Sequence, residues 1–109
     1  PYQLDARKCL SYLNIELEGP IPEPERAHVG EQLYGCDICQ DVCPWNRKPE
    51  PKGRPEFQPR PGLMNPRLSD IEALTEESFQ ATFAGSPVER RGLLGLAATA
   101  RAIRETREP

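Results

Sequence analysis

The sequence predicts a mainly α-helical chain of 109 residues without a central β-sheet. Apolar residues recur at helical spacing near both ends, which predicts short amphipathic helices there. Seven of the 13 prolines lie between residues 44 and 66, where neither a helix nor a central strand can persist. We therefore expect three parts: a cysteine-bearing module at 1–45, a proline-rich basic linker at 46–68 and a helical segment at 69–109.

The composition is that of a polar protein, with 37% hydrophobic and 28% charged residues. The longest apolar run, Leu93–Ala100, contains Gly95 and is too short to cross a bilayer. No secretory signal peptide is recognisable at the N-terminus, so we expect a cytoplasmic protein without membrane contact. We also expect a monomer. The chain begins at Pro1 and its single methionine is Met64, so we expect it to be a piece of a longer protein.

The first predicted helix spans Ala6–Glu16, with Asp5 as its cap. Three leucines at near-helical spacing place Cys9 on the apolar side of this helix, which Gly19 and Pro20 end. These leucines are Leu10, Leu13 and Leu17.

A second short helix is expected over Glu25–Leu33, after an extended turn that contains Pro20, Pro22 and Pro24. It ends at Gly35, which directly precedes Cys36. Glycine suits a position where the backbone turns sharply and aims the next side chain.

The linker at 46–68 is expected to run extended over a surface, as a strap. Residues 46–66 contain five Lys or Arg against two Glu, a local charge of +3 between acidic flanks. Two interpretations stay open for these cations: contacts to phosphate groups, or a solvated linker. The residues are Arg47, Lys48, Lys52, Arg54 and Arg60.

The sequence predicts helices in the last 43 residues. Ser69 with Glu72, and Ser86 with Glu89, match the spacing of a capping box, and Pro87 occupies the favoured first helical position.

Between these two boxes, Thr75 can cap a helix that places Phe79 and Phe83 on one face. The final helix carries an apolar stripe opposite arginines Arg90, Arg91, Arg101 and Arg104. The stripe consists of Leu93, Leu96, Ala97, Ala100 and Ile103.

The chemistry-bearing motif is GCDICQDVCPW, in which Cys36, Cys39 and Cys43 follow the spacing C-x2-C-x3-C-P. This is the end of the bacterial ferredoxin run, whose last cysteine ligates the other cluster in two-cluster proteins. By the same logic, Cys36 and Cys39 share one [4Fe-4S] cluster with Cys9, and Cys43 reaches a second cluster. The predicted fold class is therefore half of a ferredoxin-like two-[4Fe-4S] module, followed by the proline-rich extended strap and a small helical tail.

Two four-iron clusters need eight thiolates, and this sequence has four cysteines. We expect the other four in a C-x2-C-x2-C-x3-C-P run that precedes Pro1 in a longer chain.

Other interpretations of the cysteines stay open. Structural zinc sites use four cysteines as well, but usually in two C-x2-C pairs, of which only one is present. Two disulfides, or inert buried thiols, are a further alternative.

No residue is nominated as catalytic. The only histidine, His28, is expected on the surface, and the sequence has no Gly-rich phosphate loop. Trp45, together with Ile38 and Val42, is expected to shield the clusters from water and to tune their potential.

Two stretches resemble one enzyme family. One is LDARKCLSYLNIELEGPIPEPERAHVGEQLYGCDICQDVCPWNRK, which is similar to the second half of the ferredoxin-like module of epoxyqueuosine reductases, and GSPVERRGLLGLA is similar to their C-terminal helices. The resemblance spans residues 1–107 and is strongest over 4–47.

The resemblance implies a cobalamin-dependent oxidoreductase with two [4Fe-4S] clusters, which reduces epoxyqueuosine to queuosine at the wobble position of a tRNA. An N-terminal domain binds cobalamin in such enzymes, and the clusters pass electrons to it from a donor protein or reductant. The resemblance assigns Cys9, Cys36 and Cys39 to one cluster and Cys43 to the other, and it leaves Arg90 and Arg91 as candidates for tRNA contact. Because the cobalamin domain is absent here, we expect this chain alone to be inactive.

Two rival functions are compatible with the same cysteines. A corrinoid reductive dehalogenase-like enzyme also combines cobalamin with two clusters, and a plain electron-transfer or zinc-binding module needs no catalysis.

Overall fold

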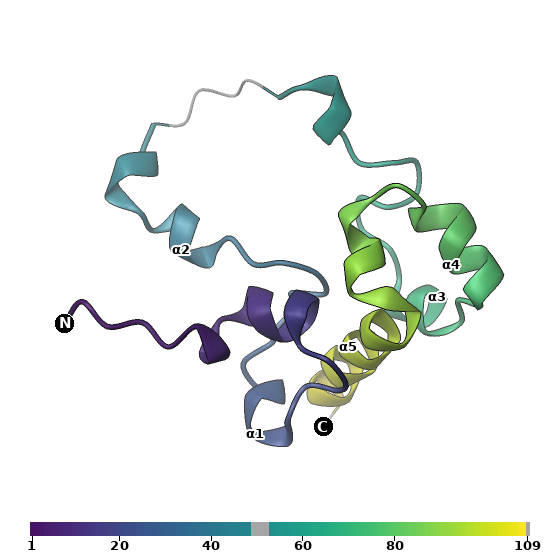
Figure 1. Cartoon of the computed structure of the whole chain (residues 1–109), viewed down its shortest axis with the longest axis horizontal. Coiled ribbons are helices and arrows are strands. Elements are labelled where there is room, and N and C mark those ends of the chain that lie inside the picture. Colours follow the sequence, from purple (N-terminus) through teal and green to yellow (C-terminus); the bar gives the residue numbers. More distant parts are fainter. Residues whose placement is uncertain (49–52, 109) are drawn as a thin grey trace.

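The computed structural model describes residues 1–48 and 53–108, and within these residues it is helical or irregular, without a strand. Five α-helices are labelled in Figure 1: α1 (Glu23–Arg26), α2 (Ile38–Asp41), α3 (Leu68–Glu72), α4 (Glu76–Phe83) and α5 (Gly92–Arg107). Shorter helical turns are η1 (Ala6–Lys8), η2 (Tyr12–Glu16), η3 (Pro44–Asn46), η4 (Pro55–Phe57) and η5 (Pro87–Arg90). The mainly helical class predicted from the sequence is confirmed.

The continuous helix predicted over Ala6–Glu16 is wrong, because the chain breaks at Cys9. Asp5 caps η1 as expected, but Cys9 itself has an extended backbone. The following turn, η2, is a π-helix in which the Leu17 N–H donates to the Tyr12 carbonyl. The wider turn places two consecutive side chains, Leu13 and Asn14, in the interior, at 2% and 1% exposure. Cys9 consequently lies exposed in the break and not on an apolar helix face.

The helix predicted over Glu25–Leu33 is a single turn, α1, which begins earlier and ends at Arg26. Gly30 adopts a left-handed conformation (φ +59°), which a helix cannot contain. Val29, beside it, is 1% exposed and anchors the irregular segment to the core. Pro24 lies in the first turn of α1, where proline is tolerated.

Helix α5 lies between two hydrophobic clusters. Its residues Leu96 and Ala100 belong to one cluster, which also contains Ile71 from α3 and Phe79 and Phe83 from α4. Ile103, about two turns further on, belongs to the other cluster, which also contains Leu13, Ile21 and Val29. The helix therefore joins the N-terminal cysteine-bearing segment to the C-terminal helices.

The predicted pairing of Phe79 with Phe83 is confirmed, because both side chains are buried and their ring centroids lie 5.2 Å apart. Thr75 caps α4 as predicted, because its hydroxyl accepts from the N–H of Ser78. The hydroxyl of Ser78 accepts in turn from the N–H of Thr75, which completes a capping box. The apolar stripe of α5 is confirmed at Leu96, Ala100 and Ile103.

Both predicted Ser–Glu capping boxes are wrong. Ser69 lies inside α3, whose N-cap is Arg67, because Leu68 begins the helix and packs against both hydrophobic clusters. Ser86 does precede η5, but its hydroxyl makes no cap bond. Glu89 instead accepts from the backbone N–H of Gly85.

The proline-rich segment contains only the short turns η3 and η4 among its described residues, in line with the absence of long elements predicted there. Arg60 joins it to the end of α4, because its guanidinium donates to the carbonyls of Thr82 and Ala84 at 2.8 and 2.9 Å. Pro49, Pro51 and Lys52, which belong to this segment in the sequence, lie outside the described residues.

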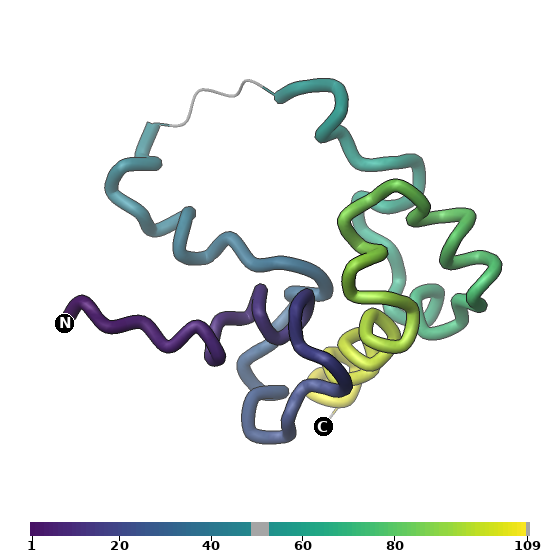
Figure 2. Tube along the Cα trace, viewed as in Figure 1, coloured from purple at the N-terminus to yellow at the C-terminus, as the bar shows by residue number. Residues whose placement is uncertain are grey.

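The N-terminal tail and the segment that carries α2 both extend away from helices α3 to α5, as the trace in Figure 2 shows. Tyr2 and Leu4 in this tail are 107% and 85% exposed. No helix in the described part of the chain is both long and apolar enough to cross a membrane.

Candidate metal centre

Three of the cysteines lie on one short loop built around α2. Gly35 introduces the loop with a left-handed backbone (φ +74°), which a residue with a side chain adopts only with strain. The single turn of α2 forms as the Gln40 and Asp41 N–H groups donate to the Asp37 carbonyl at 2.9 Å. Cys39 lies within this turn, Cys36 precedes it and Cys43 follows it. Pro44 then starts η3, so the C-x2-C-x3-C-P motif occupies one compact helical turn and its two flanks.

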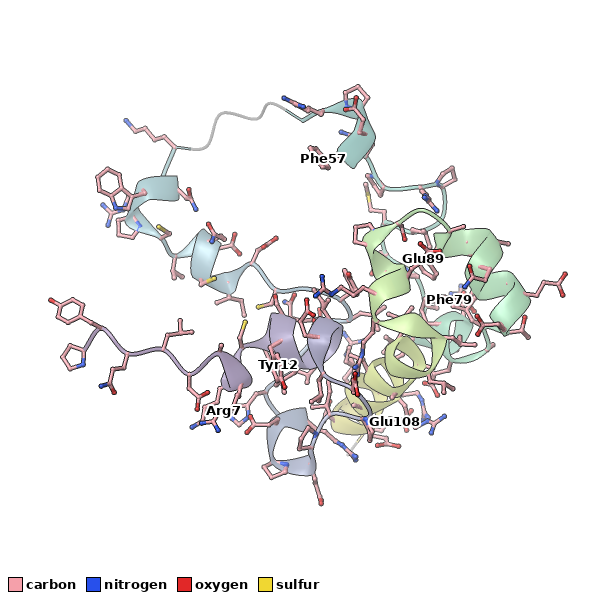
Figure 3. The ribbon with its side chains drawn as sticks, in the orientation of Figure 1. Arg7, Tyr12, Phe57, Phe79, Glu89 and Glu108 are labelled. Carbon is pink, nitrogen blue, oxygen red and sulfur yellow. The ribbon has the colours of Figure 1, made fainter. Side chains whose placement is uncertain are left out.

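All four cysteines are free thiols, and their exposure divides them into two pairs. Cys9 and Cys39 are exposed, whereas Cys36 and Cys43 are half-buried. Figure 3 shows sulfur atoms along the α2 segment and at the N-terminal turns close to it. The thiols thus come from the two places that the sequence motifs indicated.

The two cysteine-bearing segments contact each other through polar side chains of the turn that follows Cys9. The Ser11 hydroxyl donates to the Cys36 carbonyl at 3.4 Å. Three residues later, the side-chain amide of Asn14 bonds to the backbone on both sides of the turn at Gly35. The break at Cys9 is therefore held beside the start of the cysteine loop.

A charged pair lies just before Cys9. The Arg7 guanidinium donates to both carboxylate oxygens of Asp5, at 2.9 and 2.8 Å, and this hydrogen bonding lowers the pKa of Asp5 to about 2. Asp5 is therefore ionised at neutral pH, and its charge is compensated locally by Arg7.

Among residues 1–48 and 53–108, no three His, Cys, Asp or Glu side chains lie close enough together to hold one metal ion. The ligands of a four-iron cluster bind separate iron atoms, so their sulfurs lie farther apart than the ligands of a single ion. The donors present suit such a cluster chemically, because they are soft, free thiols that come from one tight loop and one neighbouring segment.

The three apolar side chains that were expected to shield the clusters are exposed in this structure. Trp45 is 95% exposed, Val42 74% and Ile38 53%, because the loop lies away from both hydrophobic clusters. We call these three exposed apolar side chains of the cysteine loop its apolar rim. His28 is on the surface, as expected, 3.9 Å from Glu25.

The arginines expected to contact tRNA have other partners. Arg91 is only 7% exposed, and its guanidinium donates to the carbonyls of Leu17 and Gly19. Arg90 pairs with Glu16 at 2.7 Å. The assignment of Arg91 to tRNA contact is therefore wrong, because a buried guanidinium bound to main-chain carbonyls cannot reach a phosphate.

The roles of two residues in this region were not predicted from the sequence. Asn14 lies two positions before Glu16 in a run of apolar and polar residues that carries no motif, and Arg91 belongs to an ordinary Arg-Arg pair. The sequence feature that could have pointed to Asn14 is its place between Leu13 and Ile15, where a small amide interrupts an apolar run.

Residues 1–46 match the 4Fe-4S double cluster binding domain. Curated relatives over most of the chain are epoxyqueuosine reductases. The one from Pseudomonas aeruginosa is 49% identical over 92 residues, which is 84% of this chain and 26% of that protein. The one from Escherichia coli K12 is 48% identical over 94 residues, 86% of this chain and 25% of that protein.

Solved structures agree with the sequence relatives. An epoxyqueuosine reductase from Bacillus subtilis superposes with a TM-score of 0.82 at 33% identity, over 94% of this chain and 27% of that one. The same TM-score and coverage hold for an epoxyqueuosine reductase with an epoxyqueuosine-modified tRNA-Tyr stem loop. The Streptococcus thermophilus enzyme gives a TM-score of 0.81 at 31% identity, over 98% of this chain and 28% of that one.

The chain spans about a quarter of the length of these relatives. Its cysteine loop lies inside the double-cluster domain, and the structural match covers 94% of the chain and so extends beyond that domain. In both sequence and fold, this chain therefore matches a C-terminal part of the epoxyqueuosine reductases.

Proposed function

We propose that this chain is the C-terminal iron–sulfur part of a cobalamin-dependent epoxyqueuosine reductase, which reduces epoxyqueuosine to queuosine in tRNA. The observation that carries the proposal is the set of four free thiols inside a match to a double-cluster domain. The names of the sequence relatives and structural neighbours support the substrate, and one neighbour is a complex with an epoxyqueuosine-modified tRNA stem loop.

In this proposal, the four thiolates serve two [4Fe-4S] clusters. Cys9, Cys36 and Cys39 bind one cluster, and Cys43, at the far end of α2, binds the other. The four remaining ligands belong to the part of the enzyme that this chain does not span. The single turn of α2 supports this division, because it separates Cys43 from Cys36 along the loop.

The clusters, when bound, carry single electrons toward the cobalamin site. This chain's own residues hold the clusters and shape their surroundings. Gly35 turns the backbone before Cys36, and the apolar rim of Ile38, Val42 and Trp45 removes water where it becomes covered. Removal of water around thiolate ligands changes a cluster's reduction potential.

We assign the three parts of the chain different roles: the module at 1–45 holds the clusters, the linker at 46–68 straps it to the rest of the enzyme, and the segment at 69–109 supports both. The bonds from Arg60 to the end of α4 support a strap that lies on the C-terminal helices. We propose that the enzyme acts in the cytoplasm, where its tRNA substrate is found, that it is a monomer, and that an electron donor protein or small reductant supplies the electrons.

Contacts to tRNA are assigned to the exposed cations of the linker. Arg47, Lys48 and Arg54 are all exposed, in the segment whose local charge is positive. Arg91 is excluded from this role by its burial, and Arg90 is directed toward Glu16.

Metal content is the first test. The complete enzyme that contains this chain, purified without oxygen, should hold iron and acid-labile sulfide at about eight of each. Zinc without iron or sulfide would overturn the proposal in favour of a zinc module.

The ligand assignment is tested by replacing single cysteines. Cys9→Ser, Cys36→Ser and Cys39→Ser should all alter the electron paramagnetic resonance signal of the same cluster, whereas Cys43→Ser should alter the signal of the other. One shared effect for all four variants would contradict the assignment. The control is Ser11→Thr, which retains a hydroxyl that can donate to the Cys36 carbonyl.

Activity distinguishes the remaining rivals. The complete enzyme should convert epoxyqueuosine-containing tRNA to queuosine-containing tRNA, measured by mass spectrometry of nucleosides, and should not dehalogenate organohalides. The reverse result would favour a reductive dehalogenase-like enzyme. This chain alone, lacking half of the ligands, should show neither activity and hold at most one unstable cluster.

A further inference from the structure

The side chain of Asn14 occupies the junction between the two cysteine-bearing segments. It is 1% exposed, and it lies on the π-helical turn η2, five residues after Cys9. Its amide nitrogen donates to the Gln32 carbonyl at 2.9 Å and to the Gly35 carbonyl at 3.0 Å. Its amide oxygen accepts from the Gly35 N–H at 2.9 Å.

These three bonds use both amide protons and one oxygen acceptor site. The orientation of the amide is fixed by its partners, because two carbonyls require N–H donors and the Gly35 N–H requires an acceptor. Leucine has a similar shape and provides none of these bonds, and aspartate provides only the acceptor. Among the standard side chains of this size, asparagine alone satisfies all three groups.

The bonds act directly on the backbone that positions Cys36. Gly35 has a left-handed conformation, and Asn14 binds both its N–H and its carbonyl. The carbonyl of Gly35 belongs to the peptide group that continues into Cys36. The Ser11 hydroxyl, one turn earlier, donates to the carbonyl of Cys36 itself.

The same helical turn is also tied to Cys9. The N–H of Leu13, next to Asn14, donates to the Cys9 carbonyl at 3.1 Å. One buried amide therefore connects the backbone around Cys9 with the backbone around Cys36, although 26 residues separate these cysteines in the sequence. A cluster bound by thiols from two segments requires a fixed separation between those segments. Asn14 lies between the two segments, where its hydrogen bonds can fix that separation.

We propose that Asn14 is a positioning residue for the cluster held by Cys9, Cys36 and Cys39, setting the distance and orientation between its two cysteine-bearing segments. This proposal rests on the proposed function, since it concerns a cluster assigned there. All three hydrogen bonds of Asn14 go to backbone groups, so in this proposal it acts through the segments that carry the cysteines and not as an iron ligand.

The test compares Asn14→Leu and Asn14→Asp with the unchanged complete enzyme after anaerobic reconstitution. Both variants should lose about half of the bound iron and sulfide, since one of two clusters is affected. The resonance signal of that cluster should disappear or shift, while the signal assigned to the Cys43 cluster persists. Iron content and both signals equal to those of the unchanged enzyme would overturn the proposal.

A matched control separates positioning from loss of general stability. Thr99 is also buried, at 0% exposure, and its hydroxyl donates to the Gly95 carbonyl in α5, away from the cysteines. Thr99→Val should lower the melting temperature without changing iron content or either signal. Equal loss of iron in Thr99→Val and the Asn14 variants would reduce Asn14 to a purely structural role and overturn the proposal.

Ser11→Ala provides a milder variant in case the Asn14 variants do not fold. It removes only the bond to the Cys36 carbonyl and should release the cluster to an iron chelator several-fold faster than the unchanged enzyme. An unchanged release rate would count against the proposal. If the unchanged enzyme itself binds no iron, the proposed function has failed, and that result is distinct from all of these outcomes.

Discussion

The guanidinium of Arg91 occupies the space beside Gly95 that a larger residue would need. A Cβ atom at position 95 would lie 2.5 Å from Nε of Arg91 and 2.7 Å from its Cδ. Arg91 is held there because its terminal nitrogens donate to the carbonyls of Leu17 and Gly19. Its burial lowers the pKa of the guanidinium. The position of Arg91 therefore requires glycine at position 95, and Arg91 in turn binds the N-terminal segment to α5.

Gly95→Ala should destabilise the protein, against the usual trend for a helix interior. Alanine normally stabilises a helix by about 1 kcal/mol relative to glycine. Here the added methyl group would displace a buried arginine, which should cost about 1–3 kcal/mol in the free energy of unfolding. Urea unfolding monitored by circular dichroism measures the change.

The double variant Arg91→Ala with Gly95→Ala identifies the cause. Arg91→Ala alone removes two hydrogen bonds, but in its background the second substitution should no longer be destabilising, since the clash is removed. A stabilising effect of Gly95→Ala in the unchanged protein would contradict the relationship between the two residues.

Glu72 should contribute to stability in a pH-dependent way. Hydrogen bonds from the Arg104 guanidinium, at 2.8 and 3.3 Å, hold the pKa of Glu72 below its ordinary value. An ionised carboxylate with a lowered folded-state pKa stabilises the protein above its unfolded-state pKa of about 4.3, and the contribution is lost as the pH falls through the lower folded-state value.

Glu72→Gln should therefore lower the urea midpoint at pH 7 and leave a smaller difference from the unchanged protein at pH 3. Glu18→Gln, at an exposed position outside the helices, serves as the control and should change little at either pH. Equal losses for Glu72→Gln at both pH values would show that the ion pair does not act through ionisation of Glu72.

The features predicted correctly from the sequence are those set by near neighbours. Thr75 caps α4 because Ser78 is three residues away, and Phe79 meets Phe83 across one helical turn. The spacing of the cysteines in their loop is likewise local. Short-range rules suffice for all of these features.

The features that could not be predicted depend on distant partners. Arg91 is buried because it reaches a carbonyl 74 residues earlier in the chain, which no local pattern indicates. The break at Cys9 follows from a π-helical turn that buries Leu13 and Asn14 together, against partners supplied by later segments. Tertiary contacts override helical periodicity in both cases.

Binding of tRNA should depend on the linker cations and not on Arg91. Replacing Arg47, Lys48 and Arg54 together by alanine in the complete enzyme should weaken binding and reduce the slope of its salt dependence by about one for each phosphate that is no longer neutralised. Titration of a labelled tRNA at several salt concentrations measures this slope. Arg101→Ala, which removes a cation from α5 at 61% side-chain exposure, is the control. The same change of slope for each removed charge in the control and in the linker variant would show that only overall charge matters.

Removal of the clusters should expose the thiols to modification in an order set by their burial. In the metal-free protein, Cys9 and Cys39 are exposed and should react first with iodoacetamide, whereas the half-buried Cys36 and Cys43 should react roughly ten-fold more slowly. In the loaded enzyme, the proposed ligand assignment places all four thiolates on iron, so all four should be protected, because an iron-bound thiolate is a weaker nucleophile than a free one. Mass spectrometry of the digested protein, before and after treatment with a chelator and an oxidant, gives the rate for each cysteine. Protection of Cys39 that is lost when the metal is removed would identify it as a ligand, because the rest of the enzyme is present in both states: rapid alkylation of Cys39 in the iron-loaded enzyme would remove it from the ligand set.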